Sequence, residues 1–210
     1  MRDRNAPLTA AEIPALEWDK MGGLIPAAVQ DAATLQLLML GYMNEEALRQ
    51  TLESGLVTFY SRSKGRLWTK GETSGNHLKL VAVLPDCDND ALLVRAEPVG
   101  PTCHLGTDSC FSADGPGGVG WLTRLAQIVG ARADADPEQS YTARLLAKGA
   151  GRIAQKIGEE GVEVALAGAS GSREECISES ADLIYHLTVL MQARGFDWDD
   201  VAAALKERHR

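Results

Sequence analysis

Short runs of apolar residues recur along the first half of the chain and predict β-strands separated by turns, such as the one at Lys64-Gly65. One stretch, residues 45–54, has helical spacing instead, with Asn44 placed as N-cap and Gly55 as C-cap. The pattern therefore predicts an α+β unit in which sheet dominates. The predicted strands cover residues 24–30, 35–40, 56–60, 77–84 and 91–97.

In the second half the apolar residues follow helical spacing, beginning with Leu122, Leu125 and Val129. The pattern therefore predicts an all-α unit. The later predicted helices cover residues 140–148, residues 152–167, a long helix that begins at the capping box of Ser172 and Glu175 and ends at Gly195, and a last helix with Asp197 as its N-cap.

A glycine-rich segment, residues 112–120, separates the half with the strand pattern from the half with the helical pattern. Its sequence, Ser-Ala-Asp-Gly-Pro-Gly-Gly-Val-Gly, is typical of a linker. The chain has 210 residues, enough for two small domains that each bury a core. We therefore expect one domain over residues 1–115 and a second over residues 116–210.

Charge and hydropathy narrow the class of protein. The net charge is −8 and both halves are acidic, which disfavours a surface for DNA or RNA. The sequence contains no apolar run of the roughly 18–20 residues that span a membrane, and its N-terminal region lacks the apolar core of a secretory signal. We expect a cytoplasmic protein with no membrane partner.

The first candidate site is the acidic motif at residues 86–90, Asp-Cys-Asp-Asn-Asp. In an extended segment Asp86, Asp88 and Asp90 share one face, where a cation such as Mg²⁺ or Ca²⁺ would relieve their repulsion. An EF-hand loop is disfavoured because Ala91 occupies the position where its sharp turn requires glycine. A solvated acidic turn remains the alternative.

The second candidate is a set of thiols. Cys87, Cys103 and Cys110 lie close together in the sequence but form no Cys-x-x-Cys pair, whereas Cys176 stands apart as an expected buried helix residue. Three thiolates leave a tetrahedral zinc one ligand short, as in catalytic sites. His104 is a candidate fourth ligand or a general acid or base. Buried free thiols are the alternative.

The third candidate is the loop of residues 61–76, which mixes cations, hydroxyls and glycines. Such a loop can cradle a phosphate because its backbone N–H groups lie beside positive charge. From the residues alone, a basic surface hairpin is the favoured interpretation.

The fourth candidate is the pattern Glu-Glu-x-x-Glu followed by Glu-x-x-Asp. Glu159, Glu160 and Glu163 fall within one arc of a helix, and Glu179 and Asp182 face alike on the next. If the two helices pack antiparallel, these acids meet beside an apolar seam, which favours a divalent cation over a solvated acidic stripe.

Long blocks of the chain resemble two enzyme families, and the resemblance spans residues 24–209. The blocks FYSRSKGRLWTKGETSGN, LPDCDNDALL and GPTCHLGTDSCF resemble phosphoribosyl-AMP cyclohydrolases. The blocks SYTARLLAKG, KIGEEGVEVALA and ESADLIYHL resemble phosphoribosyl-ATP pyrophosphohydrolases. The resemblance implies a bifunctional hydrolase of histidine biosynthesis, with an N-terminal α+β cyclohydrolase domain and a C-terminal helical bundle of the MazG-like type.

The resemblance also implies the chemistry. The C-terminal domain would split phosphoribosyl-ATP into phosphoribosyl-AMP and pyrophosphate, and the N-terminal domain would then open the purine ring between N1 and C6. It further implies homodimers whose zinc ligands come from both chains. The implied site residues are Glu159, Glu160, Glu163, Glu179 and Asp182 for Mg²⁺, Cys87, Cys103 and Cys110 for Zn²⁺, Asp86, Asp88 and Asp90 for Mg²⁺, His104 for proton transfer, and Arg62, Lys70, Ser74, Asn76, Lys148 and Lys156 for the substrates.

Two other classes of protein fit parts of the sequence. One is a general nucleotide pyrophosphatase with a zinc-binding accessory module, which would hydrolyse ordinary nucleoside triphosphates and open no ring. The other is a metal-stapled interaction protein, which would turn over no substrate. Neither explains the block at residues 59–76 that resembles a substrate loop.

Overall fold

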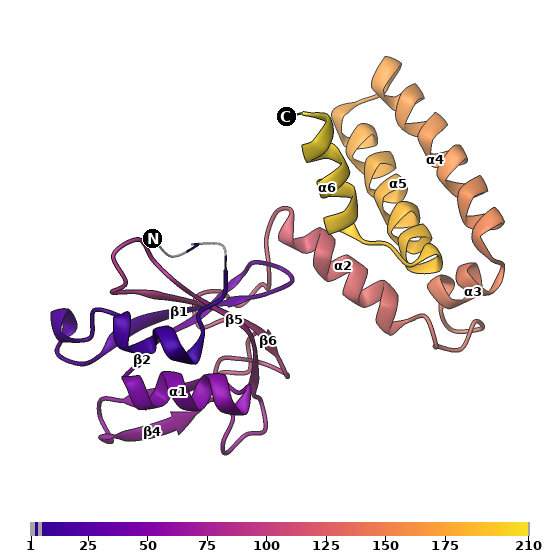
Figure 1. The fold of residues 1–210 in the computed structure, drawn as a ribbon. Helices are drawn as coiled ribbons and strands as arrows, with labels where there is room; N and C mark the ends of the chain where they lie inside the picture. The colour runs from indigo at the N-terminus through magenta and orange to yellow at the C-terminus, as the bar shows by residue number, and fades with distance from the viewer. Residues whose placement is uncertain (1–2, 4–5, 210) are drawn as a thin grey trace. The chain divides into compact units, whose positions relative to one another are not determined.

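The computed structural model describes residue 3 and residues 6–209. The chain divides into two compact units, Met1–Gly120 and Trp121–Arg210, each of which is described by itself (Figure 1). The first unit contains sheet and the second is helical, so the predicted two-domain layout is confirmed.

A four-stranded sheet forms the frame of the first unit. Its strands are β1 (Ile25–Asp31), β2 (Leu37–Met43), β5 (Leu78–Pro85) and β6 (Leu92–Pro98), in the order β2-β1-β6-β5. The central pair β1 and β6 is parallel, and both edge strands pair antiparallel to their neighbours.

A helix and a hairpin lie on one side of this sheet (Figure 1). The helix is α1 (Glu45–Ser54), and, as predicted, the Asn44 side chain caps it by accepting the Ala47 N–H. The hairpin pairs β3 (Thr58–Ser61) with β4 (Arg66–Thr69). Strand β4 was not among the predicted strands, but its pairing with β3 across the turn at Lys64-Gly65 agrees with the surface hairpin that the residues of this loop favoured. Two 3₁₀ helices, η1 (Ala10–Ala15) and η2 (Asp19–Met21), precede the sheet.

The core of this unit lies between the sheet, α1 and the hairpin. Residues of β1 alternate between buried and half-buried, so Ile25 and Val29 face the core together with Val94 of β6. Leu48 of α1 and Phe59 of β3 cover them. The alternation confirms that this sheet buries one face far more than the other.

The turn between β5 and β6 corrects one prediction. Residues 86–90 are not extended, because they reverse the chain between two antiparallel strands and Asn89 adopts a left-handed conformation with φ 62°. One oxygen of Asp86, Oδ1, accepts the N–H groups of Asp90 and Ala91 at 3.1 and 3.2 Å. The alternating face predicted for the three aspartates is therefore wrong.

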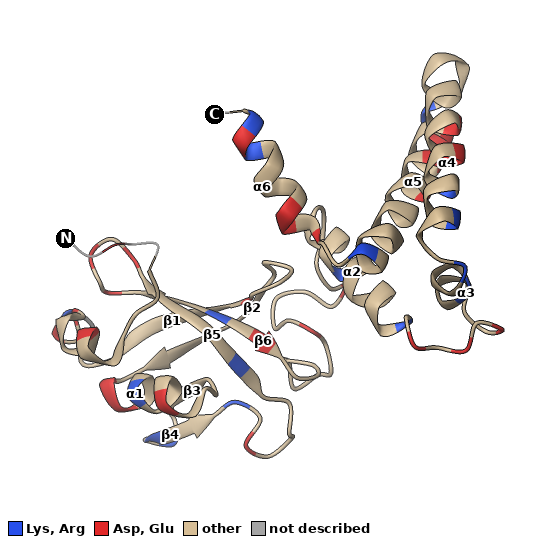
Figure 2. Cartoon of the chain, turned by 45° about the vertical axis from the view of Figure 1, so that its right-hand side comes forward, with Lys and Arg blue, Asp and Glu red and all other residues tan. Residues whose placement is uncertain are grey.

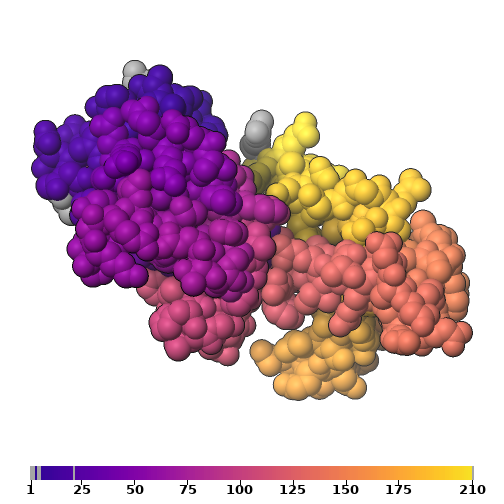
Figure 3. Space-filling model, turned by 90° about the horizontal axis from the view of Figure 1, so that it is seen from below, coloured from indigo at the N-terminus to yellow at the C-terminus, as the bar shows by residue number. Residues whose placement is uncertain are grey.

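The second unit consists of α2 (Gly120–Ala131), α3 (Tyr141–Ala147), α4 (Ala150–Ser170), α5 (Arg173–Arg194) and α6 (Trp198–Arg208). The predicted capping box of Ser172 and Glu175 is present, and Asp197 caps α6. Helices α4 and α5 form an antiparallel hairpin over a small apolar core (Figure 1). Helix α6, yellow in Figure 3, lies at the surface of its unit.

Within residue 3 and residues 6–209, no helix is long and apolar enough to cross a membrane.

Candidate active sites

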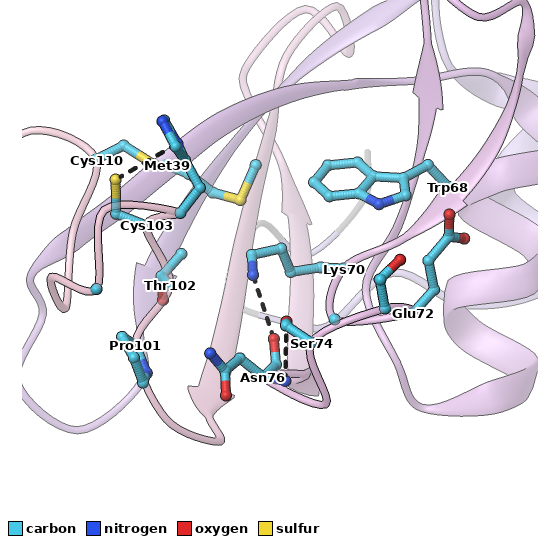
Figure 4. A pocket seen from close by; sticks show the side chains of 14 residues that line it. Met39, Trp68, Lys70, Glu72, Ser74, Asn76, Pro101, Thr102, Cys103 and Cys110 are labelled. Carbon is cyan, nitrogen blue, oxygen red and sulfur yellow. Dashed lines mark hydrogen bonds between the residues drawn. The ribbon is translucent and has the colours of Figure 1, made fainter.

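A cavity of about 470 Å³ lies in the first unit where several strand ends converge (Figure 4). Lys70 follows β4, Asn76 precedes β5, and the segment with Cys103 and Cys110 follows β6. The structure thus brings together six of the predicted site residues, although the sequence places them far apart. They are Lys70, Ser74, Asn76, Cys103, His104 and Cys110.

Close backbone packing shapes the floor of this cavity. Gly71 has φ +86°, and a Cβ at this position would lie 2.5 Å from the carbonyl carbon of Asn76. His77 Nδ1 lies 2.9 Å from the carbonyl oxygen of Lys70, which ties the start of β5 to the end of β4. Only glycine fits at position 71, because any side chain would push the two segments apart.

Lys70 is a buried cation in this cavity. Its side chain reaches the carbonyl oxygen of Asn76, to which Nζ donates at 3.2 Å, and only 8% of the residue is exposed. Burial lowers the pKa of Lys70, and the negative charges of Cys110 and Cys103 oppose that change. A desolvated ammonium group of this kind suits an anionic ligand.

Cys103 and Cys110 are the two cysteines that line the cavity. The backbone N–H of Leu105 and then the Thr107 hydroxyl lower the pKa of Cys103. Desolvation and the neighbouring Cys103 raise the pKa of Cys110. Negative charge is therefore favoured on Cys103, and thiolates are the ligands that zinc prefers. His104 is exposed, with Nδ1 3.9 Å from the Cys103 sulfur.

Cys87 lies elsewhere in the unit. It occupies the turn after β5, whereas the cavity lies at the start of β5, and this eight-residue strand separates the two by roughly 25 Å. Ligand atoms of Asp86, Cys87 and Asp88 lie within 4.8 Å of one another. One chain therefore brings two of the three predicted zinc thiols into the cavity and leaves the third at the opposite end of the strand.

The remaining acids of this turn face a lysine. Lys20 Nζ lies 2.6 Å from Asp88 Oδ2 and 2.5 Å from Asp90 Oδ2. A hydrogen bond from Lys20 lowers the pKa of Asp88, and the two aspartates raise the pKa of Lys20. The turn thus attracts positive charge, as the predicted Mg²⁺ site requires, but Asp90 points to Lys20 and is not grouped with Asp86 and Asp88.

Arg62 lies in a second cavity of about 420 Å³. Its guanidinium carbon is 3.9 Å from the centre of the Tyr42 ring, a cation–π contact that holds the side chain over β2. Met39 and Trp68 line both this cavity and the one that contains Lys70. The structure therefore separates Arg62 from Lys70 but places the two in neighbouring cavities.

A cluster of acids joins α4 and α5 in the helical unit, where Asp and Glu residues occur on both helices (Figure 2). Ligand atoms of Glu160, Glu179 and Asp182 lie within 4.8 Å of one another. Glu160 is only 5% exposed. Three oxygen donors beside a buried carboxylate match the preference of Mg²⁺ for oxygen ligands.

Basic residues flank this cluster on α4. Lys156 Nζ contacts Glu159 Oε2 at 2.9 Å and Glu160 Oε1 at 2.8 Å. Hydrogen bonds from Lys156 lower the pKa of both glutamates. Glu159 turns toward Lys156 and, at 3.6 Å, toward Arg152, so it lies outside the cluster.

Glu163 and Lys148 complete the predicted set in this unit. A hydrogen bond shared with Glu160, together with the charge of Glu160, raises the pKa of Glu163. This crowding of carboxylates is the repulsion that a divalent cation relieves. Lys148 is exposed at the end of α3.

Two residues beside the cluster were missed by the sequence reasoning. His186 is 5% exposed, and its Nδ1 lies 3.6 Å from Glu160 Oε1. The hydroxyl of Tyr141 lies 3.1 Å from His186 Nε2. The available signal was the position of His186, one helical turn after Asp182, which places the two residues on one face of α5.

Comparisons with known proteins match both units. Residues 39–112 match the phosphoribosyl-AMP cyclohydrolase family, and residues 122–209 match the phosphoribosyl-ATP pyrophosphohydrolase family. The chain is 56% identical over 207 residues to the histidine biosynthesis bifunctional protein HisIE of Vibrio parahaemolyticus, covering 96% of this chain and 98% of that protein. It is 56% identical over 205 residues to the Escherichia coli K12 protein of the same name, covering 97% of this chain and all of that protein.

Proposed function

The chain belongs to the family of histidine biosynthesis bifunctional proteins, and from this premise we propose how its residues perform the two reactions. It is a bifunctional hydrolase. The helical unit converts phosphoribosyl-ATP to phosphoribosyl-AMP and pyrophosphate, and the sheet unit then opens the purine ring of phosphoribosyl-AMP between N1 and C6.

In the helical unit, the acids of α4 and α5 hold Mg²⁺ in our proposal. Glu160, Glu179 and Asp182 provide the central oxygen ligands, and Glu159 and Glu163 complete the set as the triphosphate enters. Bound Mg²⁺ supplies a Lewis acid at the phosphates and a source of nucleophilic water. Lys156 lies beside two of the glutamates and Lys148 is exposed, so both are suited to contact phosphate oxygens.

In the sheet unit, Cys103 and Cys110 hold Zn²⁺ in our proposal, together with a third thiolate. The distance along β5 prevents Cys87 of the same chain from reaching them, so we assign the third ligand to Cys87 of a second chain. Bound Zn²⁺ supplies a means of activating water at neutral pH. His104 is exposed next to Cys103 and is our candidate for proton transfer to the opening ring.

Because the third zinc ligand is assigned to a second chain, we propose that the active protein is a homodimer. Apolar side chains are exposed on the sheet unit, including Leu40 at 49% and Val81 at 55%, and a second chain would cover such residues. The turn of residues 86–90 would carry its three aspartates, with Mg²⁺, to the partner's cavity together with Cys87. We also assign the helical unit to the MazG-like bundles and the protein to the cytoplasm, where free thiols persist.

The two cavities suggest how phosphoribosyl-AMP lies in the sheet unit. This substrate carries two phosphate groups, one on each ribose. One cavity holds the buried Lys70, and the neighbouring cavity holds Arg62. In our proposal one phosphoribosyl arm lies near Lys70, Ser74 and Asn76, and the other crosses Met39 and Trp68 to reach Arg62.

Substitution of the two cations tests this placement. Lys70→Ala and Arg62→Ala are expected to raise the KM for phosphoribosyl-AMP about tenfold or more, because each removes a charge-assisted hydrogen bond to phosphate. Steady-state kinetics of ring opening measures the change. Lys64→Ala is the matched control, since Lys64 belongs to the same loop and lines neither described cavity. A KM that is unchanged in both variants would show that this region is only a surface hairpin.

Zinc content tests the assignment of the thiols. The protein purified without chelator is expected to hold about one zinc per chain, and Cys110→Ser is expected to lower that content. Cys176→Ser is expected to leave it unchanged, because Cys176 lies half-buried on α5 in the other unit. Metal analysis of both variants provides the measurement, and an equal loss of zinc from both would contradict the assignment.

The observation that carries the proposal is that each unit gathers its own ligand set. Thiols, a buried lysine and an asparagine converge in the sheet unit, and carboxylates converge in the helical unit. Incubation with phosphoribosyl-ATP, with pyrophosphate and the ultraviolet spectrum followed together, tests both steps. A general nucleotide pyrophosphatase would release pyrophosphate from ordinary nucleoside triphosphates and would leave the purine spectrum unchanged.

A further inference from the structure

A polar network joins three helices of the second unit and ends at the buried Glu160. The Tyr141 hydroxyl of α3 lies 3.1 Å from His186 Nε2 of α5. The other ring nitrogen, Nδ1, lies 2.9 Å from the carbonyl oxygen of Asp182 and 3.6 Å from Glu160 Oε1. His186 and Glu160 are each 5% exposed, so this end of the network is shielded from water, whereas Tyr141 is 46% exposed.

The hydrogen bonds determine which ring nitrogen carries the proton. The carbonyl oxygen of Asp182 can only accept, so His186 Nδ1 must be protonated. In the neutral ring Nε2 is then the acceptor, and the Tyr141 hydroxyl donates to it. The ring also packs edge-on against Tyr141 and Tyr185, at 85° and 77°. His186 is therefore held on both edges in one orientation.

This orientation places the Nδ1 edge of the His186 ring beside one oxygen of Glu160. The Nδ1–H group donates to the carbonyl oxygen of Asp182, and Nδ1 lies 3.6 Å from Glu160 Oε1, a close polar contact that is longer than a hydrogen bond. Lys156, one helical turn before Glu160 on α4, contacts the same Oε1 atom at 2.8 Å through Nζ. Because both contacts go to one oxygen, they restrain rotation of the carboxylate.

We propose that His186, held by Tyr141, is a positioning residue that fixes the carboxylate of Glu160 for metal binding. The proposal rests on the proposed function, in which Glu160 is a ligand of Mg²⁺. It adds a role for two residues that lie outside the proposed set of metal ligands and phosphate contacts. Groups that orient metal ligands typically change metal affinity or activity by about 10- to 100-fold when they are removed.

A neighbouring contact of the same kind offers a matched control. The hydroxyl of Tyr185 lies 2.8 Å from Thr142 Oγ1 and also connects α3 with α5. Tyr141 and Tyr185 are stacked, with ring centres 6.2 Å apart. Loss of either hydroxyl removes one hydrogen bond between the same two helices, but only the hydroxyl of Tyr141 connects to Glu160 through His186.

The experiment compares full-length His186→Leu, His186→Asn, Tyr141→Phe and Tyr185→Phe with the unsubstituted protein. Mn²⁺ serves as the probe metal, and the binding that disappears in Glu160→Gln defines this site. We expect His186→Leu to weaken that binding about 10- to 100-fold. We expect His186→Asn to restore part of it, because the asparagine amide places a donor near the position of Nδ1, and Tyr141→Phe to weaken it less than His186→Leu.

Kinetics of pyrophosphate release provides a second readout. The Mg²⁺ concentration for half-maximal rate is expected to rise in His186→Leu and Tyr141→Phe, whereas Tyr185→Phe is expected to match the unsubstituted protein. Ring opening shows whether the sheet unit of each variant is active, and thermal unfolding shows whether the helical unit is folded. If His186→Leu does not fold, His186→Asn and Tyr141→Phe decide the question.

Two outcomes separate this inference from the proposed function. If folded His186 and Tyr141 variants bind Mn²⁺ as tightly as Tyr185→Phe, while Glu160→Gln abolishes binding, the positioning role is wrong and the metal site stands. If Glu160→Gln retains both Mn²⁺ binding and pyrophosphate release, the metal site itself is wrong.

Discussion

Glu160→Gln is expected to lower pyrophosphate release from phosphoribosyl-ATP by about two orders of magnitude or more. The substitution preserves the volume of a side chain that is 5% exposed, but it removes the negative charge at the centre of the acidic cluster. It also weakens the contact with Lys156, which lies 2.8 Å from Oε1. The loss therefore reflects metal binding and not a cavity in the core. A pyrophosphate-coupled assay at saturating Mg²⁺ provides the measurement.

The same variant tests whether the two chemistries are separable. Supplied phosphoribosyl-AMP is expected to be opened at a near-normal rate, because the thiols and Lys70 belong to the other compact unit. Glu174→Gln is the control, since this glutamate is exposed in the first turn of α5 and lies outside the acidic cluster. If Glu160→Gln also abolishes ring opening while the protein stays folded and zinc-loaded, one composite site would replace the two proposed here.

The fold was predictable where local chemistry determines it. The cap of α1 at Asn44, the capping box of Ser172 and Glu175, and the cap of α6 at Asp197 are interactions between near neighbours in the sequence, and all are present. A hairpin was the favoured interpretation of residues 61–76, but β4 itself was not among the predicted strands. Its sequence, Arg-Leu-Trp-Thr, is polar at both ends, and its pairing with β3 makes it a strand.

The candidate sites, like the fold, were predictable only where the spacing of near neighbours in the sequence determines them. The carboxylates of α4 and α5 follow helical spacing, so the meeting of Glu160 with Glu179 and Asp182 could be anticipated. The turn of residues 86–90 was anticipated only as an alternative, because the pattern of alternate acids fits an extended segment as well as a turn between two strands. The separation of Cys87 from Cys103 could not be anticipated from the sequence, because it depends on the direction and length of β5.

The complementary change, Cys103→Ala, is expected to lower ring opening about a thousandfold. Cys103 is 8% exposed in the cavity, and the Leu105 N–H group and the Thr107 hydroxyl favour its thiolate, so it is the thiol best suited to hold zinc. A bound metal contributes several kcal/mol to transition-state stabilisation, and about 1.4 kcal/mol corresponds to a tenfold change in rate. The ultraviolet change that accompanies ring opening provides the measurement, with zinc content determined on the same sample.

The helical unit serves as the internal control for this variant. Pyrophosphate release from phosphoribosyl-ATP is expected to continue at a near-normal rate, because its acidic ligands lie on α4 and α5, so phosphoribosyl-AMP accumulates. Cys176→Ala is the matched variant, since it removes a thiol from α5 without touching the cavity. If Cys103→Ala keeps its zinc and opens the ring normally, the metal is held by other residues and the thiol assignment is wrong. If it also stops pyrophosphate release while folded, the two units do not act independently.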